Sequence, residues 1–247
     1  LFSFNSINST GVFAGFSTYW YRELFRDGAT LAALKNTLLL AVSSSLIATV
    51  IGTVAAVGIF KLKSRAAKSA IMTVTNIPMM NPDIVTGISM MLLFVFVCVR
   101  LAGAASLSFA TVLVAHITFN LPYVILSVMP KLRQMDRHLT EAALDLGCTP
   151  MQAFWKVELP SIMPGVVSGL IMAFTLSLDD FVISYFVSGS TFTTLPVEIY
   201  NYTKKPMSPT IYALFTLMFL IILILLLVMN IADIRRDKKK AALYGRT

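Results

Sequence analysis

The chain has 247 residues, of which 57% are hydrophobic and only 13% are charged, and its formal net charge at pH 7 is +8. A soluble domain carries about 25% charged residues, so this composition excludes an ordinary water-exposed surface. We therefore expect an all-α, polytopic membrane protein in which residues 1–247 form a single transmembrane domain.

Five long stretches almost free of charged residues predict membrane-spanning helices, because a helix needs about 20 apolar residues to cross a bilayer. We place these spans at residues 31–60, 70–99, 106–130, 160–187 and 210–232. The second span is interrupted by Pro78, Asn81 and Pro82. A broken helix is tolerated in a membrane only where it faces protein or a water-filled cavity, so this break indicates an internal position.

The basic residues predict how the chain is oriented. Fourteen of the twenty Lys and Arg lie in the loop after the first span, in the loop at 131–159 and in the C-terminal tail. By the positive-inside rule these three segments should be cytoplasmic. Anionic lipid of the inner leaflet then accounts for the positive net charge, and we expect no nucleic-acid partner.

The second cytoplasmic loop carries an unusual pattern, EAALDLGCTPMQAFWKVELP, over residues 141–160. Good helix formers are followed by Gly147, which suits a left-handed helix end, and Thr149-Pro150 is typical of a new helix start. We expect Pro160 to end that second helix and to open the next span. Because the loop holds no catalytic set of residues, we interpret it as a docking element.

This spacing resembles the EAA loop of the permease subunits of ABC importers. The matching residues are Glu141, Ala142, Ala143, Gly147, Val157, Leu159 and Pro160. The one departure is Val157, where the family usually has Ile. In that family the loop sits in a cleft of an ATPase subunit, so the resemblance implies that these residues couple the chain to an ATPase. It also implies a helix bundle of the type I ABC importer permease kind.

Three acidic residues, Asp83, Asp179 and Asp180, fall inside the predicted spans. A charge at the bilayer centre costs about 2.5–3.5 kcal/mol on insertion scales, so such residues usually mark a transport pathway. Lys35 lies at the outer end of the first span, so we expect no basic residue within the membrane to neutralise them, and we therefore predict a cationic cargo. Ser177 is a further candidate to bind the cargo, and Trp20 offers a cation–π face at the outer entrance.

These side chains also have structural interpretations, which the sequence leaves open. Asp83 follows an Asn-Pro pair and would suit a cap of the helix that restarts there. Asp179 or Asp180 would suit an ion pair with a base on a partner subunit. Trp20 would equally suit an anchor at the membrane interface.

Signals of enzyme activity are missing from the sequence. It has no phosphate-binding GxxxxGK[ST] motif, no Ser-His-Asp set and no metal-ligand spacing. His116 and His138 are isolated, and we interpret both as structural. We therefore expect no catalytic residue, no bound metal and no cofactor in this chain.

Three segments narrow the cargo further. NPDIVTGISMMLLF, AHITFNLPYV and LSLDDFVISYFVSG resemble the PotC-type permeases of spermidine/putrescine importers. That resemblance implies polyamine transport across the bacterial inner membrane, with a second, related permease, two ATPase subunits that use ATP and Mg²⁺, and an extracytoplasmic polyamine-binding protein. It also implies six spans, so we expect one span to precede residue 1.

Two other interpretations remain open at this point. A permease for another cationic or neutral solute would carry the same EAA loop. An ion-coupled secondary transporter would use the intramembrane acids for protons or sodium. That second alternative leaves the EAA loop unexplained and calls for inverted repeats, which the sequence does not display.

Overall fold

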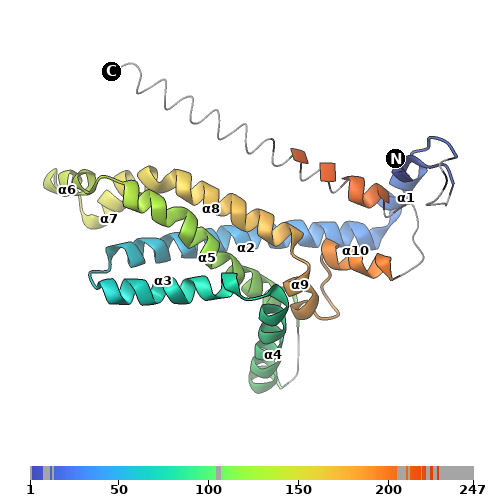
Figure 1. The fold of residues 1–247 in the computed structure, drawn as a ribbon, viewed down its shortest axis with the longest axis horizontal. Coiled ribbons are helices and arrows are strands. Elements are labelled where there is room, and N and C mark those ends of the chain that lie inside the picture. The colour runs from blue at the N-terminus through green and yellow to red at the C-terminus, as the bar shows by residue number, and fades with distance from the viewer. Residues whose placement is uncertain are drawn as a thin grey trace, which may run out of the picture. The chain divides into compact units, whose positions relative to one another are not determined.

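A computed structural model describes residues 2–7, 12, 14–103, 107–204, 210, 212–217, 219–220, 223–224 and 227. These residues are almost entirely helical, which confirms the all-α prediction (Figure 1). They group into two compact units, unit 1 with residues 1–31 and 199–247, and unit 2 with residues 32–198.

Unit 2 contains most of the helices, and two of them, α2 and α10, extend into unit 1. In chain order they are α2 (Gly28–Lys61), α3 (Arg65–Met80), α4 (Asp83–Ala102), α5 (Phe109–Gln134), α6 (Arg137–Asp145), α7 (Pro150–Ala153), the π-helical turn η2 (Phe154–Glu158), α8 (Leu159–Asp179), α9 (Val182–Val187) and α10 (Leu195–Thr203). Among the described residues, four helical stretches are long and apolar enough to cross a membrane: Gly28–Lys61, Asp83–Arg100, Phe109–Gln134 and Pro150–Asp179.

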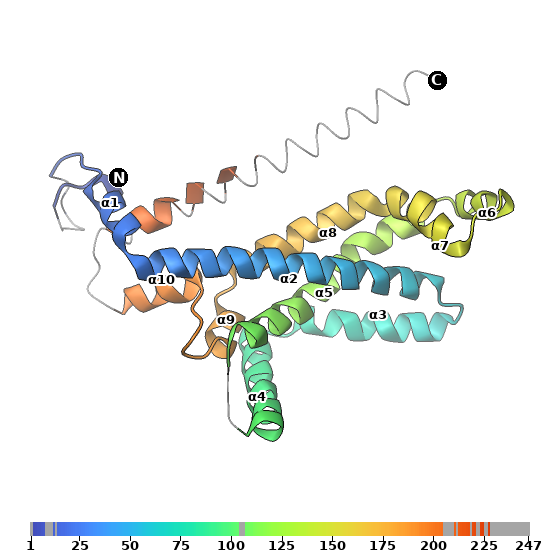
Figure 2. The same ribbon diagram turned by 180° about the vertical axis from the view of Figure 1, so that it is seen from behind.

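The predicted break in the second span is confirmed, but the span itself is shorter than the predicted 70–99. Helix α3 ends at Met80 and α4 begins at Asp83, because Asn81 and Pro82 both take extended backbone angles. The chain turns sharply there, so that α4 runs across the direction of α3 in both ribbon views (Figures 1 and 2). Within the predicted second span, only Asp83–Arg100 is long and apolar enough to cross a membrane.

The predicted fourth span, 160–187, also stops early. Helix α8 ends at Asp179 because the next residue, Asp180, takes an extended conformation, and the short α9 follows. The first and third predicted spans correspond to α2 and α5. About half of the fifth, 210–232, lies outside the described residues.

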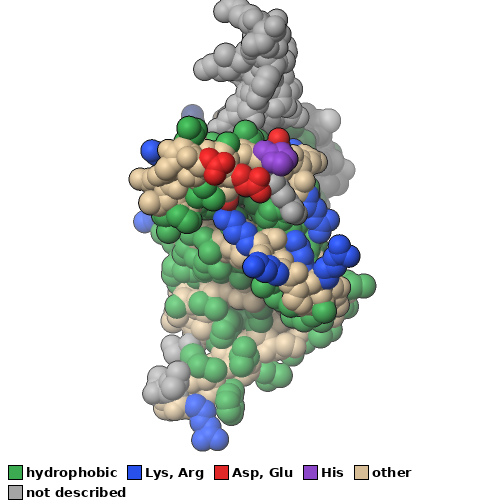
Figure 3. All heavy atoms as spheres, turned by 90° about the vertical axis from the view of Figure 1, so that its left-hand side faces the viewer, with side chains coloured by type: hydrophobic (Ala, Val, Ile, Leu, Met, Phe, Trp, Pro, Cys, Tyr) green, Lys and Arg blue, Asp and Glu red, His purple; other side chains and the backbone are tan. Residues whose placement is uncertain are grey.

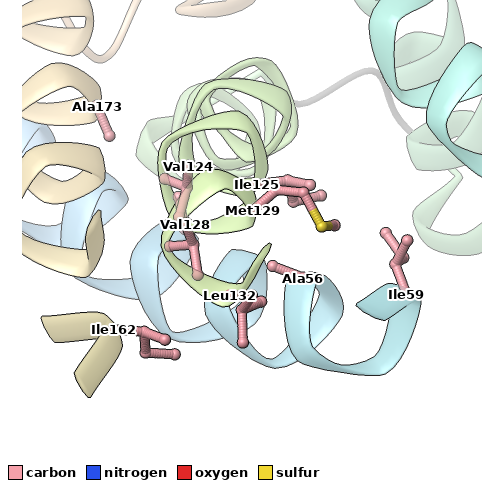
Figure 4. Packing of buried hydrophobic residues seen from close by; sticks show 10 residues of the cluster. Ala56, Ile59, Val124, Ile125, Val128, Met129, Leu132, Ile162 and Ala173 are labelled. Atoms are coloured by element: carbon pink, nitrogen blue, oxygen red, sulfur yellow. The ribbon is translucent and has the colours of Figure 1, made fainter. Parts of the chain in front are cut away.

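The core of unit 2 is built around α5, which packs between α2 and α8 (Figure 4). Val124, Val128 and Leu132 of α5 are fully or almost fully buried. They pack in one cluster with Ala56 of α2 and Ile162 of α8. Helices in a membrane associate mainly through such van der Waals packing, since lipid tails are as apolar as the side chains.

Glycines allow these helices to approach closely. A Cβ atom added at Gly165 of α8 would lie 2.8 Å from the carbonyl oxygen of Ser127 on α5, and one at Gly52 of α2 would lie 2.7 Å from the Val124 side chain. Gly169, one turn after Gly165, would place a Cβ 3.3 Å from the Cα of Val124. Small residues at such contacts let two backbones meet in a membrane bundle.

Unit 1 contains η1 (Phe2–Phe4) and α1 (Tyr19–Arg26), and its clearest polar feature lies at Asp27. The Asp27 carboxylate accepts hydrogen bonds from Thr30 Oγ1 at 2.6 Å, from the Ala29 backbone N–H at 3.1 Å, and from the Tyr202 hydroxyl. Burial raises the pKa of Asp27, but these hydrogen bonds outweigh it and hold the pKa below its usual value. The carboxylate therefore stays ionised where α2 begins.

We predict that Gly165→Ala destabilises the chain, whereas Gly58→Ala does not. An added methyl at Gly165 must displace the α5 backbone, which costs about 1–3 kcal/mol. A Cβ at Gly58 of α2 has nothing within 4 Å, and alanine is the better helix former. The free energies of unfolding of both variants, measured by SDS titration in detergent micelles, should differ by that amount. Equal stability would contradict the close α5–α8 contact.

Candidate functional site

The EAA-like segment forms a compact helical element between α5 and α8, which we call the coupling element (residues 137–158). Its first helix, α6, is capped by Asp136, whose side chain accepts the backbone N–H of His138 at 3.0 Å. Glu141 and Ala142 lie on this helix, and Ala143 is buried within the element. The predicted first helix of the loop is therefore confirmed.

The turn inside the coupling element follows the local signals in the sequence. Gly147 has a φ of +85°, in the left-handed region that favours glycine. The Thr149 hydroxyl accepts the Gln152 backbone N–H at 3.3 Å, while the Gln152 side chain accepts the Thr149 N–H at 3.0 Å. This reciprocal capping box, with Pro150 at the first helical position, starts the next helix as expected.

Pro160 does not end that helix, which corrects our expectation. The chain is helical without interruption from Pro150 to Asp179. The π-helical turn η2 makes this possible, because the Leu159 N–H bonds back to the Phe154 carbonyl and the proline that follows has no N–H to satisfy. Val157, Leu159 and Pro160 therefore lie inside one continuous helix, and the coupling element connects directly to the predicted pathway.

The coupling element exposes large hydrophobic side chains. Leu146 is 86% exposed, and the others are Leu139, Leu144, Met151 and Trp155. Figure 3 looks onto the end of unit 2 that carries α6 and α7, where acidic and histidine side chains lie together and basic side chains lie beside them. An apolar surface with a charged rim is typical of a protein interface. The motif spacing alone did not point to these residues.

An ion pair connects the coupling element to α2. Lys61 Nζ lies 2.9 Å from Glu158 Oε2, and the Glu158 side chain is only 4% exposed. This contact brings the two basic loops of unit 2 to the same end of the bundle. Glu158 was missed from the sequence because the EAA spacing leaves its position open, although an acid next to three apolar motif residues was a usable signal.

Asp180 is surrounded by partners from its own chain. Its carboxylate accepts the backbone N–H groups of Ser184 at 2.8 Å and of Ile183 at 3.3 Å, which fixes the start of α9. His116 Nε2 lies 3.3 Å from Asp180 Oδ2, and the Asp180 side chain is 9% exposed. The sequence leaves open that a base on another subunit pairs with Asp180. In the structure, His116 of α5 lies beside its carboxylate.

Ser177 lies in the same buried network. Its hydroxyl is hydrogen-bonded to His116 Nδ1 at 2.7 Å and to the Ser44 hydroxyl of α2 at 2.9 Å. His116 Nε2 also lies 3.1 Å from the Ser184 hydroxyl. His116 is buried and hydrogen-bonded, as a structural histidine would be, but it is not isolated.

The other two acids are exposed. Asp179, the last residue of α8, makes no hydrogen bond or ion pair to another side chain in the part of the chain that the structure describes. Asp83 is the first residue of α4. Among the described residues its side chain makes no capping hydrogen bond, which weakens the capping interpretation. Whether these acids contact cargo stays a prediction.

Trp20 belongs to unit 1, where its indole N–H donates to the Asn5 carbonyl at 2.7 Å. Its ring also meets Tyr19 edge to face. Its predicted role at the outer entrance stays a prediction. Over the described residues, no group of three or more His, Cys, Asp and Glu side chains forms a candidate metal site.

Comparison with known proteins shows which family the sequence matches. The model of the family described as binding-protein-dependent transport system inner membrane component matches residues 48–237. The putrescine transport system permease protein PotI of Escherichia coli K12 is 40% identical over 217 residues, which cover 88% of this chain and 77% of the relative. The spermidine/putrescine permease PotC of the same strain is 38% identical over 215 residues, 87% of this chain and 79% of the relative.

Solved structures agree on the fold. One is a bacterial ABC transporter involved in the import of the acidic polysaccharide alginate, with a TM-score of 0.73 at 15% identity, covering 88% of this chain and 83% of that one. Another is the methionine ABC transporter MetNI, with a TM-score of 0.58 at 18% identity, covering 85% of this chain and 96% of that one. The predicted importer-permease bundle is thereby confirmed as a fold. The family match and the permease relatives leave the ion-coupled secondary transporter without support.

We predict that Lys61→Met destabilises the transmembrane bundle and that Lys63→Met, in the same loop, does not. Without Lys61 the buried Glu158 carboxylate loses its base, which should lower the free energy of unfolding by about 1–3 kcal/mol. The exposed half of Lys61 keeps this figure modest, because solvent screens the attraction. SDS unfolding midpoints would measure both variants, and the charge swap Lys61→Glu with Glu158→Lys should recover part of the loss. Identical midpoints would argue against the ion pair.

Proposed function

The chain belongs to the family of inner membrane components of binding-protein-dependent transport systems, and on that premise we propose that it forms half of the translocation pathway of a polyamine importer. It is a multi-pass inner-membrane protein and a transport permease subunit. In this proposal the coupling element and the C-terminal tail face the cytoplasm. ATP and Mg²⁺ are used by two partner ATPases, a second related permease completes the pathway, and a polyamine-binding protein delivers cargo from outside.

One observation carries the proposal: a single helical stretch of 30 residues joins the coupling element to the acidic pair. At about 1.5 Å per residue it is about 45 Å long, enough to cross a bilayer. It starts at Pro150, next to the exposed hydrophobic residues, and ends at Asp179. A displacement of its cytoplasmic end by an ATPase would therefore reach the acids through one rigid element.

The exposed hydrophobic surface of the coupling element supports an ATPase as its partner. Leu146, Met151 and Trp155 are exposed at the turn that carries the EAA-like motif. In the proposed mechanism ATP binding closes the ATPases around these residues and favours one packing of the bundle over another. Only such a difference in contacts between two states can shift their populations.

The acids support a cationic cargo. Asp179 and Asp180 lie in a stretch, from Val157 to Thr203, that contains no Lys or Arg. A protonated amine would supply the missing positive charge, and the amines of putrescine and spermidine are protonated at neutral pH. The names of the relatives PotI and PotC point to the same cargo. Asp83 and Trp20 are further candidates along the route.

We predict that Gly147→Asp abolishes transport while the spans still insert. A non-glycine residue at this left-handed position is strained by about 1–2 kcal/mol, and the added charge lies on the docking surface. ATP-driven uptake should fall by at least about tenfold, since 1.4 kcal/mol is a factor of ten. Gly103→Asp is the matched control, because Gly103 also has a positive φ and open space around its Cα. Full uptake by Gly147→Asp would count against the docking role.

We also predict that Asp179→Asn weakens polyamine uptake with the complex intact. Loss of a charge-assisted contact to an ammonium group should raise the KM about tenfold. Uptake of radiolabelled putrescine and spermidine into proteoliposomes, at matched amounts of assembled transporter, would measure it. Wild-type uptake by the double variant Asp179→Asn with Asp180→Asn would remove the cation site, and a preference for an unrelated solute would favour the alternative cargo.

A further inference from the structure

The proposed transport cycle gives no role to His116. It lies in the first third of α5 and is 1% exposed. Both ring nitrogens are engaged: Nδ1 with the Ser177 hydroxyl, and Nε2 with the Ser184 hydroxyl and the Asp180 carboxylate. Through Ser177 the network extends to Ser44, so that it joins α2, α5, α8 and α9.

The network lies at the break between α8 and α9, where backbone N–H groups lack a helical carbonyl to bind. Helix α8 ends at Asp179, and α9 starts with N–H groups that have no helical carbonyl to bind. The Asp180 carboxylate accepts two of these N–H groups, from Ile183 and Ser184. In a bilayer no water replaces such partners, so the position of Asp180 decides where the break between α8 and α9 can lie.

The two neighbouring acids are therefore in different situations. Asp180 already binds two backbone N–H groups and the His116 imidazole, and little of its side chain is exposed. Asp179 is exposed and has no side-chain partner among the described residues. A carboxylate that already accepts several hydrogen bonds has less capacity for an incoming ammonium group than one without a side-chain partner.

We infer that His116 is a positioning residue for transport: it holds Asp180 against the start of α9 and thereby presents Asp179 as the acid that meets the cationic cargo. The inference rests on the proposed function, because it assigns roles within the same acidic pair. The close α5–α8 contact at Gly165 and Gly169 fixes these two helices along one part of their length. The hydrogen bond between His116 and Ser177 fixes them where α8 ends.

A histidine that only stabilises the fold would behave differently from a positioning residue. Its replacement would reduce the amount of assembled transporter, or the maximal rate, by the same factor whatever residue stands at 179. A positioning residue acts through Asp179, so its replacement should raise the KM for a cationic cargo. That rise should vanish once Asp179 has lost its charge, because residues that act together are not additive.

The experiment is a double-variant cycle in the complete transporter, reconstituted in proteoliposomes with its partner permease, ATPases and binding protein. The probe is radiolabelled putrescine, and KM and maximal rate are measured for His116→Leu, for Asp179→Asn and for the pair. We expect His116→Leu alone to raise KM by about tenfold, as for loss of a hydrogen bond to a charged group. In the Asp179→Asn background we expect no further rise.

Two neighbouring serines of α2 provide a matched control. Ser44 is buried and bonded to Ser177, whereas Ser43 is half-buried and bonds only to carbonyls of its own helix. Ser44→Ala should raise KM in the same direction as His116→Leu, and Ser43→Ala should leave it unchanged. If His116→Leu does not assemble, Ser44→Ala and His116→Gln decide the question by the same comparison of KM.

The outcomes separate the inference from the proposed function. If Asp179→Asn raises KM while His116→Leu, His116→Gln and Ser44→Ala match the wild type, the positioning role is wrong and the cation site stands. An equal effect of His116→Leu in both backgrounds would also overturn the inference, since it would mark a purely structural histidine. If Asp179→Asn leaves KM unchanged, the proposed cation site fails and the inference fails with it.

Discussion

Backbone polar groups inside a bilayer must find their partners within the protein, and the helix break between α8 and α9 depends on this constraint. The helix that starts at Pro150 can end at Asp179 only because the next residue offers its carboxylate to the N–H groups of α9. Asp180 in turn needs a partner in the interior, and His116 supplies it. At the break in the fourth span these polar groups therefore have their partners, which lie on three helices.

The same constraint connects the two ends of this helix mechanically. The π-helical turn carries the helix through Pro160 without an unpaired donor, so nothing interrupts it between the coupling element and the acids. Glycine contacts hold it close to α5, and the Lys61–Glu158 ion pair holds the end that carries the coupling element to α2. A helix that is held at several points along its length moves as a body with its neighbours, which is what alternating access between two packings requires.

The acidic pair shows how adjacent residues acquire different roles. Asp179 closes α8 and is exposed, whereas the extended backbone at Asp180 turns its carboxylate back onto α9. An ABC importer for a cation needs a negative charge that is free in the pathway, and also a bundle that survives having such a charge within it. In the proposed function Asp179 offers this charge, while Asp180 binds the N–H groups of α9 beside it.

What the sequence determined by itself was local or statistical. The apolar stretches, the left-handed turn at Gly147, the capping box at Thr149 and the break before Asp83 depend on residues within a few positions of one another, and each was predicted. The docking motif was visible for the same reason. The tertiary structure decided the pairing of Lys61 with Glu158 and of His116 with Asp180, because each joins helices far apart in the chain. It also decided that the helix continues through Pro160 and stops at Asp179, since packing and buried hydrogen bonds outweighed the local signals there.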